Sequence, residues 1–234
     1  MLFRSASAQD HKRAFDGDLG PNTGGMGVYS PAPIVSKELL SRVLSEIIHP
    51  AISGLKKEGI EYRGVLYAGI MITREGPKTL EFNVRFGDPE TQAILPRLKS
   101  DLVQVMLAVS TGSLAKIKDL SWDDRACVCV VLASKGYPGD YEKEKEIFGL
   151  EEAGKMEDIT VFHAGTRKKL VNDVGQKQEV EFFTSGGRVL SVTGLGNNIK
   201  EAIENTYRAV GKISFEGMHY RRDIGKKAVN SEAI

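Results

Sequence analysis

Apolar residues in the first half of the chain follow a helical period in two places. Over residues 36–57 they recur every three or four positions, which predicts a helix with Ser36 as its N-cap. Pro50 lies inside this segment and is expected to kink or split the helix, because proline lacks an amide donor. The same period over residues 91–109 predicts a second helix.

The segment between these helices has the pattern of a β-hairpin. Residues 64–74 form an apolar run typical of a buried strand, residues 75–77 predict a turn, and residues 78–86 alternate as a second strand. Residues 9–33 are rich in Gly, Pro, Asn and Asp, which indicates a loop rather than a helix.

The second half is richer in strand patterns. Strands are expected at residues 126–134 and 159–166, and residues 179–196 read as two strands joined by a tight Ser-Gly-Gly turn. An amphipathic helix is expected over residues 198–213. The sequence therefore predicts an α+β chain: a lobe of helices and strands over residues 1–124, then a small, mostly β domain over residues 125–234.

Composition excludes some classes of partner. The chain has 234 residues, and 32 basic against 31 acidic residues leave a net charge of +1, so nothing predicts a nucleic-acid or membrane partner. Cys127 and Cys129 fall in one apolar run and read as buried core thiols, which favours a reducing, cytoplasmic setting. No apolar run is long enough to predict a transmembrane helix.

The second strand of the predicted hairpin carries the first candidate chemistry. Alternation places Leu80, Phe82 and Val84 on an apolar core face. The opposite face then presents Glu81, Asn83 and Arg85. A carboxylate beside an amide oxygen suits Mg²⁺, and an arginine can bind a phosphate or carboxylate; a solvated strand face with the same residues is the alternative.

Further polar groups flank this strand and fill the glycine-rich loop. Asp88 and Glu90 follow the strand and are expected to bind an amine substrate or the arginine, with helix N-terminal acids as the alternative. The loop at Asn22, Thr23, Gly24, Gly25 and Met26 has glycines that allow backbone amides to approach an anion. Asp10, Lys12 and Arg13 precede it. The basic segment 220–228 reads as a solvated or docking tail, or as a contact for a substrate phosphate.

Seven strings occur in one order: QDHKR, GPNTGGMGVYSP, LYAGIMI, EFNVRFGDPETQ, GYPGDY, FHAGT and GGRVLSVTGLG. Together they resemble the phosphoribosylamine–glycine ligase family of ATP-grasp enzymes, from Gln9 to about Ala228. The resemblance implies the second lobe of an ATP-grasp domain, followed by the family's small C-terminal domain.

The resemblance also implies a reaction in purine biosynthesis. Glycine would be phosphorylated by ATP to a glycyl phosphate, and phosphoribosylamine would then displace phosphate to give glycinamide ribonucleotide. Glu81 and Asn83 would bind Mg²⁺ or Mn²⁺, and Arg85 would stabilise the acyl phosphate as a catalytic residue. Lys12 and Arg13 would contact ATP phosphate. The pocket for glycine and phosphoribosylamine would be lined by Asp10, Asn22, Thr23, Gly24, Gly25, Met26, Asp88 and Glu90.

The family has further domains ahead of the matching region, including the first lobe that grips ATP. We therefore expect a chain that begins in mid-domain, with residues 2–5 read as a translated sequencing adapter, and with little or no activity alone. A monomer is expected for the complete enzyme. The alternatives are another ATP-grasp carboxylate–amine ligase and a non-catalytic fragment.

Overall fold

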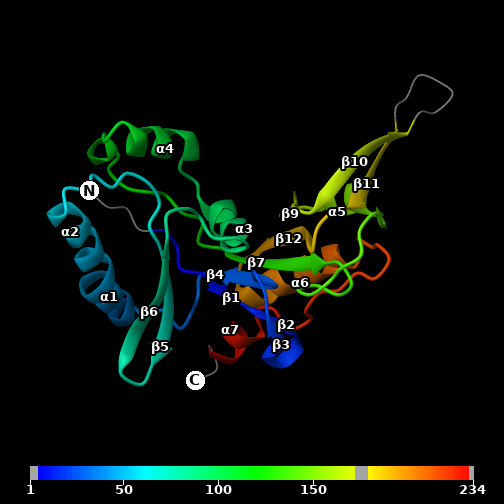
Figure 1. The fold of residues 1–234 in the computed structure, drawn as a ribbon, viewed down its shortest axis with the longest axis horizontal. Coiled ribbons are helices and arrows are strands. Elements are labelled where there is room, and N and C mark those ends of the chain that lie inside the picture. Colours follow the sequence, from blue (N-terminus) through cyan, green and yellow to red (C-terminus); the bar gives the residue numbers. More distant parts are fainter. Residues whose placement is uncertain (1–4, 172–178, 232–234) are drawn as a thin grey trace. The chain divides into compact units, whose positions relative to one another are not determined.

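A computed structural model describes residues 5–171 and 179–231 (Figure 1). The adapter interpretation of residues 2–5 falls almost entirely outside this range. The chain forms two compact units: the first contains residues 32–87 and 98–123 with the short segment before Ala8, and the second contains residues 8–31, 88–97 and the chain from Asp124 onward. These units differ from a linear division near Asp124, because two early segments pack with the C-terminal half.

The first unit begins with the predicted helix, and Pro50 divides it. Ser36 caps α1 (Lys37–Val43) by accepting a hydrogen bond from the Leu39 amide at 3.1 Å, which confirms the predicted start. A π-helical segment, η2 (Leu44–Ile48), then leads into α2 (His49–Lys57), which carries Pro50 in its first turn. The irregular turn lies directly before the proline, as its missing amide donor requires.

The predicted hairpin is confirmed, but its predicted burial is wrong. Strands β5 (Tyr67–Thr73) and β6 (Gly76–Asn83) pair antiparallel, with an irregularity at Leu80, which has no partner on β5. Leu80, Phe82 and Val84 are 64%, 44% and 74% exposed, so they form no core. In the first unit the hairpin contacts α1, and alternation alone does not reveal which of its residues such a neighbour covers.

The predicted helix over residues 91–109 is also wrong, because it is three elements. They are α3 (Glu90–Ile94), a 3-10 turn η3 (Leu95–Arg97) that contains Pro96, and α4 (Leu102–Ser110), followed by the 3-10 turn η4 (Leu114–Lys116). Asp101 starts α4 anew by accepting hydrogen bonds from the amides of Val103 and Gln104. The break separates α3, in the second unit, from α4, in the first.

The second unit is built on a five-stranded antiparallel sheet. Its order is β1 (Gln9–Asp10), β4 (Gly27–Ser30), β7 (Ala126–Ala133), β12 (Arg188–Gly196) and β9 (Ile159–His163). The segment 9–33 thus contains short strands that a loop prediction missed. All of β7 is buried.

Helices cover both faces of the central strand, which explains its unbroken apolar sequence. Cys127 and Cys129 pack with Ala93 of α3, and both thiols are free. Thr206 of α6 (Ile199–Val210) donates a hydrogen bond to the Val128 carbonyl at 3.1 Å. A strand covered on both sides needs no polar face.

Smaller elements surround this sheet. A three-stranded sheet has the order β10 (Thr166–Val171), β11 (Glu179–Thr184) and β8 (Glu146–Ile147). The two strands predicted over residues 179–196 therefore lie in different sheets. The remaining elements are β2 (Arg13–Phe15), η1 (Asp16–Asp18), β3 (Leu19–Asn22), α5 (Leu150–Gly154) and α7 (Lys226–Ser231). Among the described residues, no helix combines the length and apolarity needed to cross a membrane.

Candidate active site

Two buried carboxylates of the second unit share one lysine. Asp10 ends β1 and Glu90 begins α3, and each side chain is only 6% exposed. The Lys12 ammonium forms an ion pair with Asp10 and lies 3.8 Å from Glu90 Oε1. Sequence reasoning placed Lys12 at ATP phosphate, but here its cation lies between two acids.

This environment makes Asp10 titrate near neutrality. Burial raises the pKa of Asp10 to about 6, and the neighbouring charge of Glu90 also raises it, against the opposing effect of Lys12. A carboxyl group with such a pKa is poised to bind a cation at neutral pH and to lose it in mild acid.

The glycine-rich loop packs against this acid pair. Gly25 has φ +120°, and a Cβ atom there would lie 2.7 Å from Asp10 Oδ1, so only glycine fits. Thr23 fixes the loop through its hydroxyl, which donates to the Lys12 carbonyl and accepts from the Gly25 amide, both at 2.9 Å. The Asn22 side chain is exposed at the end of β3.

Met26 corrects one expectation for this loop. Its side chain is fully buried, and its backbone bonds to His11 and Val131. It therefore belongs to the core and does not line an open pocket.

Asp88 holds an arginine that the sequence did not single out. Its carboxylate accepts a hydrogen bond from Arg188 Nη2 at 3.0 Å, whereas the sequence suggested Arg85 as its partner. Arg188 Nη1 also donates to the Asp88 carbonyl at 2.9 Å and to the Gly24 carbonyl at 3.0 Å. Nothing in the local sequence distinguishes Arg188 from other arginines, because its partners lie far away along the chain.

The predicted metal-binding strand lies in the first unit. Glu81 and Asn83 are two residues apart on β6 and therefore share one face. Gly69 lies opposite Glu81, and a Cβ there would come within 3.1 Å of Glu81 Cγ, so the glycine leaves room for the carboxylate. One carboxylate and one amide oxygen suit a hard cation that takes its other ligands from water and nucleotide phosphates.

Arg85 does not continue this face. Strand β6 ends at Asn83, whose partner Tyr67 is the first residue of β5, and residues 84–85 form a bend. The exposed Arg85 guanidinium donates to the carbonyl of Phe86 at 2.9 Å. The alternation argument was therefore wrong for Arg85, because it assumed a strand longer than its partner. Among the described residues, no cluster of three or more His, Cys, Asp or Glu side chains could hold a metal without help.

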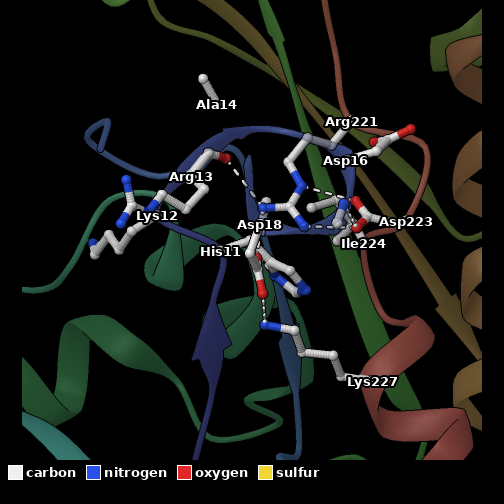
Figure 2. A network of polar contacts seen from close by, with 12 residues as sticks. His11, Lys12, Arg13, Ala14, Asp16, Asp18, Arg221, Asp223, Ile224 and Lys227 are labelled. Atoms are coloured by element: carbon white, nitrogen blue, oxygen red, sulfur yellow. Dashed lines mark hydrogen bonds and ion pairs between the residues drawn. The ribbon is translucent and has the colours of Figure 1, made fainter. Parts of the chain in front are cut away.

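Arg13 and the basic C-terminal segment belong to a network of polar contacts that is separate from the acid pair (Figure 2). The Arg13 guanidinium donates to the Gly20 carbonyl at 2.7 Å. The Arg221 side chain is fully buried and donates two hydrogen bonds to Asp223, one to Asp18 at 3.0 Å and one to the Arg13 carbonyl at 3.1 Å. The prediction of a solvated tail is thus wrong at Arg221, which fastens residues 221–227 to residues 13–18.

His11 is a further residue that sequence reasoning missed. It is 1% exposed, and its Nδ1 lies 3.0 Å from the Gly27 carbonyl, which can only accept, so this nitrogen carries the proton. Burial and the charge of Arg221 lower the pKa of His11 to about 4, so the ring is neutral at neutral pH. Its backbone amide donates to Asp10 Oδ1 at 2.8 Å, whereas its ring packs edge-on against Tyr29 as an uncharged group.

Comparison with known proteins first identifies the fold of this chain and the class of protein. N5-carboxyaminoimidazole ribonucleotide synthetase from Thermotoga maritima has a similar fold at 16% identity (TM-score 0.53, 81% of this chain and 45% of that one). The family model of the phosphoribosylglycinamide synthetase ATP-grasp (A) domain matches residues 2–91, and that of the C domain of the same synthetase matches residues 127–227. The class is therefore ATP-grasp.

More similar relatives define the family within this class. Phosphoribosylamine–glycine ligase of Rhodopirellula baltica is 51% identical over 95% of this chain. A crystal structure of the Thermotoga maritima ligase is 37% identical with a TM-score of 0.75, over 94% of this chain and 51% of that one. The chain belongs to the phosphoribosylamine–glycine ligase family, and it spans about half the length of the relatives it matches, 49% of the Rhodopirellula protein.

Proposed function

We propose that this chain contributes the second half of the site that joins glycine to 5-phosphoribosylamine at the expense of ATP. Glycine's carboxylate attacks the γ-phosphorus of ATP, which releases ADP and forms glycyl phosphate. The amine of phosphoribosylamine attacks the acyl carbon and loses a proton, and phosphate leaves to give glycinamide ribonucleotide. Family membership and the buried acid pair support this assignment.

The acid pair is the observation that carries the proposal. Asp10 and Glu90 hold the ammonium group of Lys12, and the ammonium of glycine has the same charge and the same hydrogen-bond donors. Bound there, glycine would replace Lys12 at the acids and free the Lys12 cation for a phosphate. That exchange would reconcile the predicted phosphate contact of Lys12 with its position in the structure.

Residues of β6 serve the nucleotide in this proposal. Glu81 and Asn83 would hold Mg²⁺ or Mn²⁺, which when bound neutralises the charge of the phosphate groups. Arg85, in the bend beyond the strand, would stabilise the acyl phosphate, and Arg13 would contact phosphate. The 2-oxoglutarate carboxylase domain, a fold neighbour at 11% identity, is described with MgADP. A cytoplasmic, monomeric enzyme without nucleic-acid or membrane partners completes the proposal.

The test requires a longer protein, here called the extended ligase: this chain joined behind the part of the Rhodopirellula ligase that it does not match. We expect ADP release that depends on both glycine and phosphoribosylamine from the extended ligase, and none or a trace from this chain alone. Without such release, the proposed function would be refuted, and a non-catalytic role would be favoured. Release that accepts other carboxylates equally well would instead indicate a different carboxylate–amine ligase.

Glycine binding is expected to depend on pH through Asp10. Because its pKa is about 6, Asp10 is ionised above that pH and protonated below it. Glycine's own groups do not titrate near pH 6, so its affinity should fall about tenfold between about pH 8 and pH 5. Calorimetric titration of the extended ligase measures this change, and Asp10→Asn should bind weakly at both pH values. Equal wild-type affinities would contradict the assignment of Asp10.

A further inference from the structure

Arg188 is held rigidly where it enters the second unit's sheet. It is the first residue of β12 and follows Gly186 and Gly187. Its carbonyl accepts from the Gly165 amide at 2.9 Å, and a Cβ on Gly165 would lie 2.6 Å from that carbonyl oxygen. The close approach of these backbones fixes the base of the arginine side chain.

The guanidinium joins two segments that are distant in sequence. It donates to the carbonyls of Gly24 and Asp88 and to the Asp88 carboxylate, at 2.9–3.0 Å. The Gly24 amide in turn donates to the Tyr137 hydroxyl at 3.1 Å, so side chains bind both the backbone N–H and the carbonyl of this residue. A planar fork of several donors can make these three bonds together, whereas a lysine ammonium has a different geometry.

Both segments lead directly to the acid pair. Gly24 precedes Gly25, which packs against the Asp10 carboxylate, and Asp88 lies two residues before Glu90. The hydrogen bonds of Arg188 to the described residues run to the backbone beside each carboxylate of the pair and to Asp88, rather than to Asp10 or Glu90. Its influence on the pair therefore acts through the position of the two segments.

We infer that Arg188 is a positioning residue that sets the spacing of Asp10 and Glu90, and thereby the affinity for the α-ammonium of the amino-acid substrate. The second part of this inference rests on the proposed function. Loss of the fork should affect ATP binding much less than glycine binding, because the residues proposed for the metal lie on β6 in the other unit. It should weaken glycine binding, because small displacements of positioned charges are costly.

The kinetic test compares Arg188→Ala, Arg188→Lys and the control Arg208→Ala in the extended ligase. Arg208 is an exposed arginine of α6 in the same unit, and its guanidinium donates to the Asn205 side chain at 2.8 Å. We expect Arg188→Ala to raise the KM for glycine about 10- to 100-fold with the KM for ATP within twofold. Arg188→Lys should lie between it and the wild type, and Arg208→Ala should have no effect. An unchanged glycine KM in Arg188→Ala, or equal rises in both KM values, would overturn the inference.

A second measurement is independent of ligase activity. Carbon-13 NMR of side-chain carboxyl groups in this chain should follow the titration of Asp10 near pH 6. In Arg188→Ala the loop and the turn before α3 lose their shared anchor, water reaches the acid pair, and the midpoint should move toward 3.8; Arg208→Ala should not move it. An unmoved midpoint in Arg188→Ala would refute the positioning role. If the wild-type extended ligase releases no glycine-dependent ADP, the proposed function fails, whereas this titration still decides the role of Arg188.

Discussion

Replacing Glu81 by glutamine in the extended ligase is expected to lower ADP formation about 10²- to 10³-fold, the usual loss when one group that stabilises developing charge is removed. Glutamine keeps the size of the side chain and its place beside Gly69, but it removes the negative charge that a divalent cation needs. Since Glu81 is exposed on β6, the substitution should leave folding unaffected. Steady-state ADP release at several Mg²⁺ concentrations measures the effect.

The matched control is Glu75→Gln on the turn of the same hairpin. Glu75 is exposed and pairs with Lys78 at 2.9 Å, so its loss changes the charge of the hairpin equally without touching the proposed ligand set. Higher Mg²⁺ should partly restore the Glu81 variant, because weaker binding is offset by concentration. Turnover of Glu81→Gln equal to that of Glu75→Gln would remove Glu81 from the metal site.

Arg221→Met is expected to cost about 2–3 kcal/mol of folding free energy, less than the loss of one partner of a fully buried ion pair, because Asp18 and Asp223 stay 39% and 18% exposed to water. The substitution leaves Asp18 and Asp223 facing an apolar side chain, and the carbonyl of Arg13 loses its donor. The Arg221 guanidinium also holds the pKa of Asp223 well below its usual range through hydrogen bonds. Urea unfolding of this chain, followed by circular dichroism, measures the loss.

The neighbouring Arg222→Met provides the control. Arg222 is exposed and lies over the Tyr220 ring at 6.0 Å, so its removal should cost at most about 1 kcal/mol. Adding Asp223→Asn to Arg221→Met should recover part of the loss, since the carboxylate without its partner is neutralised. Equal stabilities of the two single variants would mean that the network in Figure 2 contributes nothing to the fold.

Sequence signals that act within one helical turn or one strand predicted the corresponding elements. Ser36 indicated the start of α1 because a capping hydroxyl bonds within its own turn, and the apolar run over residues 126–134 predicted the strand β7. The prediction of a single helix over residues 91–109 was wrong, because the apolar period continues across Pro96 and Asp101. Pro96 lies in the 3-10 turn that ends the first element, and Asp101 caps the start of α4. The prediction that β5 and β6 are buried was wrong, because an apolar run or an alternating pattern indicates a strand but does not show which elements cover it.

Short sequence motifs named several residues that the structure places close together. Asp10, Gly25 and Glu90 were each named from the sequence, and the structure brings them together in the second unit. Arg188 and Arg221 were missed because their bonds reach across 100 to 208 positions of sequence. No periodicity or spacing encodes such a partner, and only the pairing of β12 and the course of the C-terminal segment place them.

The fastening by Arg221 has a consequence for synthesis on the ribosome. Its bond to the Arg13 carbonyl spans 208 positions, and β4 near the N-terminus completes its pairing only with β7, about a hundred residues later. The acid pair beside these segments therefore cannot settle into its final environment while the chain is still emerging. Non-local contacts of this kind slow folding and expose unfinished edges. A chain that stops before Arg221 would present these early strands unfastened, as a natural target for chaperones and proteases.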